Sequence, residues 1–236
     1  MAEAVLESRE SAVARLADLA RQRSGTGPAW LQQLRSEALT AFEAQGFPTR
    51  KDEAWKYTDL SPIAEIDFQV APDLPDSDSA GRLAENPFSD LENARVVFVN
   101  GRYSPQLSRL DDLPDGLQVH SMAALLEESD EVLETHLGRY AAFGENPFVA
   151  LNTALFEDGL FVHVEKGKVV EEPLQIVFFH SAQSEPSMIH PRVLVHAEAS
   201  SQVRIVETHL GHSPEQYLVN GVTELRAEQN GVIDYY

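Results

Sequence analysis

The stretch 160–236 alternates short apolar runs with Gly, Pro, Ser and Asn. Its apolar residues are mostly β-branched or bulky, the types that suit a pleated and half-buried surface. Val203 and Ile205 alternate with Gln202 and Arg204, which is the period of two expected of a strand with one dry face. The pattern predicts strands in the segments 160–166, 174–180, 193–198, 202–209, 217–227 and 228–236.

The breaks between these strands are short, as at 199–201 and 230–231. Such tight corners leave no room for crossover helices, which excludes a doubly wound α/β sheet. An antiparallel meander, a sandwich and a coil of stacked strands such as a β-helix all fit. We find no repeat with a fixed sequence period, so the spacing permits a β-helix without selecting it.

The chain end also bears on the prediction. The sequence GVIDYY places two aromatic residues in a strand that stops at Tyr236 without a polar cap. A bare apolar strand edge invites pairing with another chain. We therefore expect the natural polypeptide to continue past Tyr236.

Helical periodicity dominates the first part of the chain. The segment 4–23 has apolar residues at helical spacing and two arginines in its last turn. A second amphipathic helix is predicted from Pro28, where proline suits the first turn, to Gly46. The two helices and their glycine-rich joint predict a helical hairpin whose apolar faces pack on the rest of the protein.

The next segment, FPTRKDEAWKYTDL, is rich in large amphipathic side chains. Thr49 and Asp52 resemble a capping box, which predicts a short helix beginning near Arg50. Trp55 and Tyr57 combine buried area with a polar tip. We expect this segment to dock a helix against the sheet and not to carry catalysis.

Residues 61–94 mix four prolines with many acidic residues, which predicts an exposed linker. The sequence RVVFVNGRYSP, 95–105, has an Asn-Gly pair between two short strands and predicts a hairpin. Further helices are predicted in 121–138 and from Phe148 to the Asp158-Gly159 turn.

The charge balance excludes two classes of partner. There are 38 acidic and 18 basic residues, a formal net charge of −20, so the surface repels nucleic-acid phosphates and anionic membranes. No apolar run reaches the roughly 18–20 residues that span a bilayer. The N-terminus has neither a basic nor an apolar signal region. We expect a cytoplasmic protein that binds neither nucleic acid nor membrane.

The chain contains no cysteine. Disulfides, thiolate metal sites, persulfide carriage and thiol nucleophiles are therefore excluded for these residues. The phosphate-loop, G-x-S-x-G, H-E-x-x-H and dinucleotide-binding patterns are absent as well, and Lys166-Gly167-Lys168 lacks both the first glycine and the hydroxyl residue of a phosphate loop.

Two groups of side chains remain as candidates for chemistry. Histidines in or beside the strands could form a metal site if coiling stacked them, and two of them are close enough to share an ion, but no spacing enforces three or four converging ligands. Acidic residues on neighbouring strands could form a glycosidase-like pair, although solvated carboxylates are the ordinary case. The histidines are His163, His180, His190, His196, His209 and His212, the close pair being the last two, and the acidic residues are Glu165, Glu171, Glu172, Glu198, Glu207 and Glu224.

Two segments carry a resemblance to a known family. Pro48-Thr49-Arg50-Lys51, Glu53 and Trp55-Lys56-Tyr57-Thr58 resemble the N-terminal signature of the SufD family, subunits of SufBCD iron–sulfur cluster assembly scaffolds. The stretch 146–176, NPFVALNTALFEDGLFVHVEKGKVVEEPLQI, resembles the start of that family's core, with its Ala-Leu-Asn helix, Asp-Gly turn and Glu-Pro before a strand. The two motifs stand in the expected order, and the resemblance covers essentially the whole chain.

The resemblance implies a non-enzymatic scaffold that acts with a homologous SufB-like subunit and a SufC-like ATPase. It implies no resident cofactor in this chain, the iron–sulfur cluster being held transiently by the full complex. In the family a long β-helix is followed by a C-terminal helical domain that contacts the ATPase, and a histidine late in the core lies at the subunit interface. Both lie beyond Tyr236, so we assign no catalytic, cofactor-binding or metal-binding residue and expect these residues to bind SufC weakly or not at all.

The family's subunits associate through their core strands, so we expect the edge near Tyr235 and Tyr236 to pair two isolated copies into a homodimer. The predicted fold class is α+β, mainly β, with an N-terminal helical region followed by the first coils of a right-handed parallel β-helix. The predicted units are 1–60, helical; 61–94, linker; 95–158, a hairpin with helices; and 159–236, the incomplete core. A β-helix carbohydrate-active enzyme and a self-associating structural module are the alternatives.

Overall fold

A computed structural model describes residues 2–71, 83, 86, 88–89, 93–128, 131–180, 185–211 and 216–236. The helices are α1 (Ala2–Arg23), α2 (Ala29–Gln45), the 3₁₀ helix η1 (Glu53–Trp55), α3 (Ser61–Ala64), α5 (Met122–Glu128), α6 (Glu131–His136) and α7 (Pro147–Leu155). The strands are β1 (Gln69–Val70), β2 (Arg95–Val99), β3 (Arg102–Tyr103), β4 (Leu117–Ser121), β5 (Leu160–Val164), β6 (Leu174–His180), β7 (Ser187–Ile189), β8 (Arg192–Ala197), β9 (Gln202–Gly211), β10 (Tyr217–Val219), β11 (Val222–Ala227) and β12 (Val232–Tyr235).

The strands form three sheets, with the orders β1-β7-β10, β11-β8-β5-β4 and β12-β9-β6-β2-β3. Within 160–236 every pairing is parallel and joins strands three apart in the chain, such as β5 with β8 and β6 with β9. Strands β3 and β4 pair antiparallel with their neighbours at the edges of two sheets. Two of the three sheets are therefore mixed.

The predicted fold class, α+β and mainly β with the first coils of a right-handed parallel β-helix, is wrong. The described residues form an α/β arrangement of parallel and mixed sheets with several helices. The prediction assigned the sheets to 159–236 alone, whereas β2 and β4 from the segment before it are built into the same sheets by pairing with β6 and β5. The antiparallel meander is excluded too, because the pairings within 160–236 are parallel.

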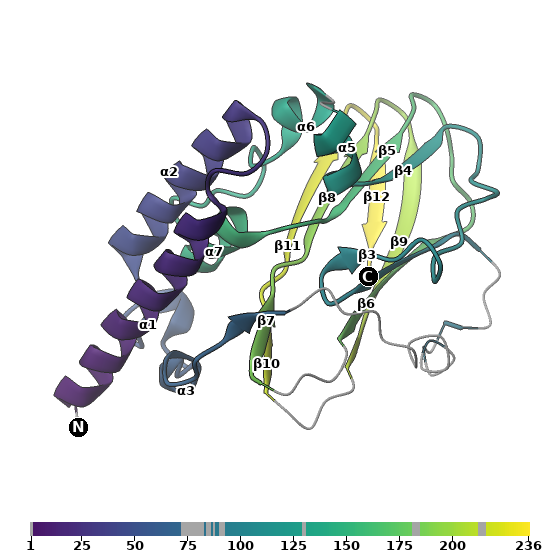
Figure 1. The fold of residues 1–236 in the computed structure, drawn as a ribbon. Helices are drawn as coiled ribbons and strands as arrows, with labels where there is room; N and C mark the ends of the chain where they lie inside the picture. The colour runs from purple at the N-terminus through teal and green to yellow at the C-terminus, as the bar shows by residue number, and fades with distance from the viewer. Residues whose placement is uncertain are drawn as a thin grey trace.

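The helical hairpin is confirmed. Helix α1 ends at Arg23, and α2 begins after Pro28 and ends before Gly46, whose N–H donates to the Phe42 carbonyl oxygen at 2.8 Å. Both helices lie on one side of the molecule, with α7 between them and the sheets (Figure 1). Their apolar faces pack on α7 around Ala38, Phe42 and Leu151.

The segment after the hairpin is only partly as predicted. Asp52 accepts a hydrogen bond from the Thr49 N–H at 2.6 Å, but the helix that follows is the short 3₁₀ helix η1. Trp55 packs against Phe148 of α7 with ring centroids 5.2 Å apart, so the docking role is right for this side chain. Tyr57 is 90% exposed, contrary to the expectation that it supplies buried area.

Part of the predicted linker 61–94 is packed. Residues 61–71 contain α3 and β1, and they bury Ala64, Phe68 and Ala71. Strand β1 pairs with β7, so a distant segment joins the smallest sheet. Much of 72–92 lies outside the described residues, and the division of the chain into four units stays a prediction.

The predicted Asn100-Gly101 turn is confirmed. Strands β2 and β3 form an antiparallel hairpin, and Asn100 and Gly101 have φ values of 50° and 83°, as a type I′ turn requires. The structure has no turn at Asp158-Gly159, where one was predicted: residues 156–159 connect α7 to β5, and a Cβ at Gly159 would lie 2.3 Å from the Arg192 carbonyl oxygen. Only glycine fits there because the backbone of β8 passes so close.

The interior between the sheets is lined by apolar side chains of β2 and β6. Val96 and Phe98 of β2 are in register with Ile176 and Phe178 of β6, and all four are buried. The apolar interior continues through the inward residues of β5, β8 and β9. A second cluster lies under α5 and α6, against Phe161 and Leu194 on the outer face of the sheet that contains β5 and β8.

A buried polar network joins the helices to the sheets. Arg192 of β8 donates to Glu224 of β11 at 2.5 Å, and neither side chain is exposed. The Arg192 guanidinium also donates to Asn152 Oδ1 at 2.9 Å and Thr153 Oγ1 at 3.0 Å, both on α7. Asn152 in turn donates to the Pro191 and Asn220 carbonyl oxygens at 2.8 and 2.7 Å. The network fixes α7 on the sheet.

A repeated corner links successive strands. Each of β5, β8 and β11 ends in a basic residue, a spacer and a glutamate: His163 and Glu165, His196 and Glu198, Arg226 and Glu228. Two residues after each glutamate the backbone has positive φ, at Gly167, Ser200 and Asn230. The register aligns His163 with His196 and Arg226. The sequence therefore contains a structural repeat, which the search for a fixed period missed.

Two histidines are buried in this framework without full hydrogen bonding. Among the described residues, His180 of β6 has no hydrogen-bond partner for either ring nitrogen, and His190 has none for Nε2. Burial, together with the positive charge of His209, lowers the pKa of His180 to about 4. Burial, together with Arg23, lowers the pKa of His190 to about 3. Both imidazoles are therefore neutral in the folded protein at pH 7.

We predict that the Arg192→Met variant loses about 3–5 kcal/mol of unfolding free energy, because it leaves the Glu224 carboxylate buried without its counter-ion. The double variant R192M/E224Q should lose less than the sum of the two single variants. Arg21→Met is the control, because Arg21 is half exposed and its ion pairs contribute about 1 kcal/mol or less. Urea denaturation measures all four. Equal losses for R192M and R21M would contradict the prediction.

The buried histidines predict acid sensitivity. Their pKa values are lower in the folded than in the unfolded protein, so the unfolded chain binds more protons below pH 6.5 and stability falls as the pH falls. Each histidine should account for about 2 kcal/mol of loss between pH 7 and pH 5. Denaturation of His180→Phe should show a pH-dependent loss smaller by that amount. An unchanged loss in this variant would refute the assignment.

Candidate functional site

The inward-facing side chains change from apolar to polar near the end of β9. Glu207 is in register with Ile176, and His209 with Phe178, so Glu207 and His209 continue two columns that are apolar in β2 and β6. The side chain of Glu207 is 20% exposed and that of His209 is 39% exposed, so the pair lies at the partly exposed end of these columns. The change marks a polar site at the edge of the apolar interior.

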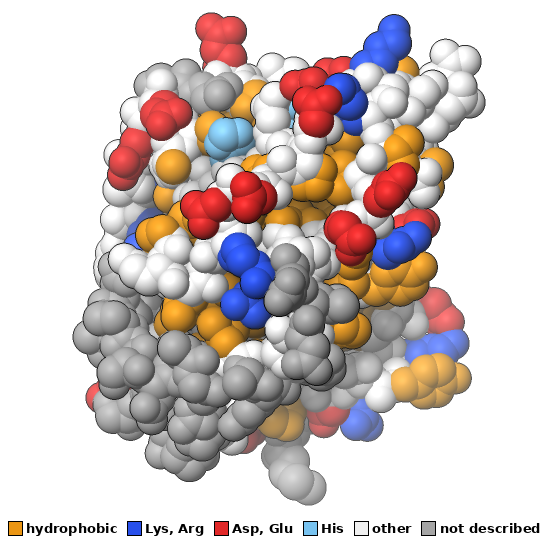
Figure 2. Space-filling view, turned by 90° about the vertical axis from the view of Figure 1, so that its right-hand side faces the viewer, with side chains coloured by type: hydrophobic (Ala, Val, Ile, Leu, Met, Phe, Trp, Pro, Cys, Tyr) orange, Lys and Arg blue, Asp and Glu red, His pale blue; other side chains and the backbone are white. Residues whose placement is uncertain are grey.

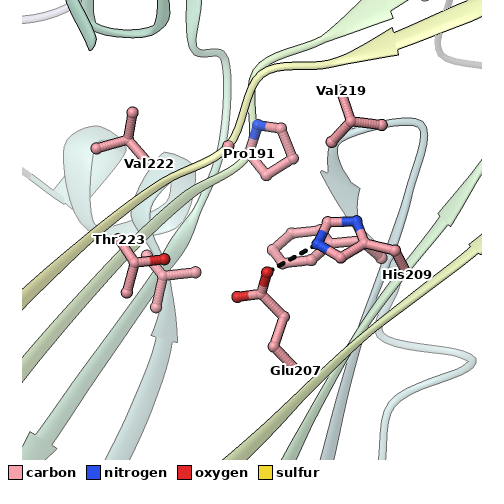
Figure 3. Close-up of a pocket in the computed structure, with 9 residues that line it drawn as sticks. Pro191, Glu207, His209, Val219, Val222 and Thr223 are labelled. Atoms are coloured by element: carbon pink, nitrogen blue, oxygen red, sulfur yellow. Dashed lines mark hydrogen bonds and ion pairs between the residues drawn. The ribbon is translucent and has the colours of Figure 1, made fainter. Parts of the chain in front are cut away.

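A cavity of about 390 Å³ opens beside this pair. Its walls are Phe178, Pro191, Val193, Glu207, His209, Val219, Gly221, Val222 and Thr223. The Glu207 carboxylate and the His209 ring point toward each other inside it, with Pro191 and Val219 on one side and Val222 and Thr223 on another (Figure 3). The cavity is thus mostly apolar with one acid–imidazole pair.

The pair is held by its neighbours. His209 Nε2 lies 2.7 Å from Glu207 Oε1, and the Tyr235 hydroxyl of β12 donates to Glu207 Oε2. The His209 ring stacks on Phe178 with centroids 5.1 Å apart. Burial and the Glu207 charge raise the pKa of Tyr235 well above its ordinary value. Tyr235 is therefore a constant hydrogen-bond donor that fixes the carboxylate.

The chemistry available to this pair is limited but definite. An imidazole oriented by a carboxylate can accept or pass a proton, and its other nitrogen can bind a metal ion. Glu207 and His209 would supply at most two protein ligands, and no group of three histidine, aspartate or glutamate side chains converges on a metal position among the residues that the structure describes. The site fits transient contact with a ligand better than a closed metal centre.

The other candidate histidines are separated by the fold. His163 and His196 lie on the outer face of the sheet and pair with Glu198 at 3.0 Å and Glu228 at 3.1 Å. His190 contacts Asn220 at 3.2 Å beneath α7. His180 stacks near His209, with ring centroids 5.9 Å apart. His212 lies outside the described residues, so its expected pairing with His209 stays untested.

The candidate carboxylates are also dispersed. Glu224 is buried against Arg192, Glu198 binds His163, and Glu207 binds His209. Glu165 accepts from Gln118 at 3.1 Å on the outer face, while Glu171 and Glu172 are exposed. The carboxylates therefore bind different types of side chain at different places in the structure. The arrangement does not favour a glycosidase-like carboxylate pair, because each engaged carboxylate already has its own donor.

Several functional features escaped the sequence analysis. Tyr235 was considered only as part of a strand edge and Glu224 only as one of several carboxylates. Their pairing with Glu207 and Arg192 was not foreseen, because only the register brings these strands together. His120 and His136 were not among the candidates, yet they line a second cavity with His163 and His196. The His/Arg-x-Glu pattern at the ends of β5, β8 and β11 was a usable signal. The Lys166-Gly167-Lys168 segment is one of the repeated corners.

Helices long and apolar enough to cross a bilayer do not occur in the part of the chain that the structure describes.

Comparison with known proteins connects this fold to one family. Residues 18–176 match the SufBD protein N-terminal region, and residues 178–236 match the SufBD core domain of the SUF system for FeS cluster assembly. The two matches follow each other along almost the whole chain, and their boundary falls within β6.

Three relatives illustrate the similarity. The chain is 32% identical to an iron–sulfur cluster assembly SufBD family protein of Synechocystis, covering 90% of this chain and 48% of that protein. It is 28% identical to the iron–sulfur cluster assembly protein SufD of Bacillus subtilis, covering 88% and 48%. It is also 28% identical to SufB of Bacillus subtilis, covering 88% and 46%.

The chain spans about half the length of these relatives. The matched regions account for both the helical part and the sheets, and the family model for the N-terminal region alone covers more than half of the chain. The resemblance seen in the sequence is confirmed: the chain belongs to the SufBD family.

Proposed function

We propose that this chain is part of a scaffold subunit of an iron–sulfur cluster assembly complex, of the SufD kind. The observation that carries the proposal is the match of two consecutive SufBD regions over residues 18–236. Relatives named SufD and SufB support the same reading. The subunit acts without catalysing a reaction of its own, and the iron–sulfur cluster is its cargo. The carbohydrate-active alternative is not favoured.

The proposed partners are a homologous SufB-like subunit and a SufC-like ATPase. Their support is the family membership of the chain and the relatives named SufB and SufD. The homodimer of the isolated chain and the cytoplasmic location stay predictions.

The surface chemistry fits a protein partner better than a polyanion. Acidic side chains are spread over the described part of the face in Figure 2, with apolar side chains between them and few basic ones. The whole chain has a net charge of −20. A partner that contacts this face gains from basic or apolar groups of its own.

The proposed function predicts the composition of the native complex. The full-length protein, tagged at its native level and recovered from cell lysate, should co-purify with an ATPase and with a cysteine-bearing SufBD homologue. Mass spectrometry of the eluate against an untagged strain identifies them. Recovery of neither partner would overturn the proposal.

The acid–imidazole cavity makes a second prediction. In the full-length complex, Glu207→Gln and His209→Phe should lower the iron and sulfide held per complex by about tenfold, the effect of losing a ligand or its orienting partner. Subunit composition should be unchanged. Glu165→Gln is the matched control, because Glu165 lies on the outer face and binds only Gln118 at 3.1 Å. Equal iron and sulfide in all variants would show that the pair is structural.

A further inference from the structure

A second group of histidines gathers outside the core, where α6 meets the sheet. The His136 ring of α6 lies 4.6 Å from that of His196 on β8, and the His196 ring lies 5.4 Å from that of His163 on β5. The three rings border a cavity of about 370 Å³ that His120 also lines. Imidazoles this close interact through their charge whenever more than one is protonated.

The three histidines differ in their partners. His163 and His196 each lie about 3 Å from a glutamate, Glu198 and Glu228. His136 instead contacts the Tyr140 hydroxyl, with Nδ1 at 2.7 Å. A carboxylate compensates a protonated imidazole, whereas a phenol does not. Among the described residues, His136 is thus the member of the group whose ring has no carboxylate as a hydrogen-bond partner.

Charged and titratable groups face His136 from every neighbouring element. Positive or protonatable neighbours outnumber the carboxylates, and the nearest ring is another histidine. The groups are His120 of β4, His163 of β5, His196 of β8, Arg226 of β11, Glu198 and Glu228 at the strand ends, and Tyr140 after α6. Burial lowers the pKa of His136, and His196, Arg226 and His163 lower it further against a smaller opposite effect of Glu228.

The turn that follows His136 connects α6 to the buried ion pair of Arg192 and Glu224. The turn after α6 donates three backbone N–H groups to the Glu224 carboxylate: Gly138 at 3.0 Å, Tyr140 at 2.9 Å and Ala141 at 3.3 Å. Glu224 holds Arg192, which holds α7. Any movement of α6 away from the sheet therefore removes donors from a carboxylate that has no access to water.

We propose that α6 and the turn 137–141 form a proton-sensitive latch, in which protonation of His136 beside His196 and Arg226 releases the turn from Glu224. The latch is closed while His136 is neutral. Protonation places a positive charge on a ring that already faces the Arg226 guanidinium. Movement of α6 away from the sheet relieves this repulsion. The apolar contacts of Leu133 and Leu137 oppose this release, so opening is local and reversible.

The direction of the pH effect follows from the charge. Opening binds a proton, so it becomes more frequent as the pH falls below the ordinary histidine pKa of about 6.5. The population of the open state rises by up to about tenfold for each pH unit, until the closed state is itself protonated. Above pH 7.5 the latch should be insensitive to pH.

Hydrogen–deuterium exchange by mass spectrometry on the full-length protein tests the latch. After correction for intrinsic exchange, peptides from 131–141 should open up to about fivefold more often at pH 5.5 than at pH 6.5, whereas peptides from α2 should not change. His136→Gln, which keeps a hydrogen-bonding side chain without titrating, should abolish the difference. His120→Gln is the control on the same face and should leave it.

The result that overturns the proposal is the same pH dependence in H136Q as in the unmodified protein, because another group would then be responsible. Opening of α2 in parallel with 131–141 would also overturn it by showing global unfolding. If H136Q does not fold, His196→Gln provides the second variant. It removes the nearest like charge, so its pH dependence should be weaker than that of the unmodified protein.

Discussion

The buried pair of Arg192 and Glu224 is the constraint on which the arrangement of helices and sheets depends. Removing two charges from water costs several kcal/mol, and their attraction repays this only when every remaining hydrogen-bonding position is filled. Here α7 supplies acceptors for the guanidinium and the turn after α6 supplies N–H donors for the carboxylate. Two successive helical segments are thereby placed on one point of the sheet, which also joins β8 to β11. Apolar packing of α2 on α7 then adds stability to a position that the polar groups have already specified.

This dependence explains which parts of the fold were predictable. The bounds of α1 and α2 and the Asn100-Gly101 turn follow from local preferences of the residues themselves, and all were found from the sequence. The choice of pairing partner is not local. Strands β2 and β3 were predicted as a separate hairpin, and no strand was predicted at β4. Strand β1 lies in a proline-rich acidic stretch that resembles a linker. The mixed sheets could not be predicted because each strand's pattern reports one buried face and not the neighbour at its edge.

The candidate site shows the same division. Residue type alone placed Glu207 and His209 among the candidates, but it gave them no priority over ten similar residues. The strand register distinguishes Glu207 and His209 from the other candidates, because it aligns both with apolar residues of β2 and β6. Tyr235 enters only through the pairing of β12 with β9. The outer repeat of a basic residue and a glutamate was visible in the sequence but unequal in spacing, so a search for a constant period passes over it.

Imidazole–carboxylate pairs occur on both faces of the strands, and their surroundings decide what each can do. On the outer face, Glu198 and Glu228 are about one-third exposed, so their pairs with His163 and His196 are screened by water and contribute little to stability. On the inner face, Glu207 is less exposed and is fixed by Tyr235, so the orientation of His209 is set before any ligand arrives. His136 has neither arrangement among the described residues, since its contact is the Tyr140 hydroxyl and Arg226 faces it. The proposed latch therefore depends on the histidine of the outer group whose contact is a phenol and not a carboxylate, because a positive charge on that ring is opposed by Arg226 and has no paired carboxylate beside it.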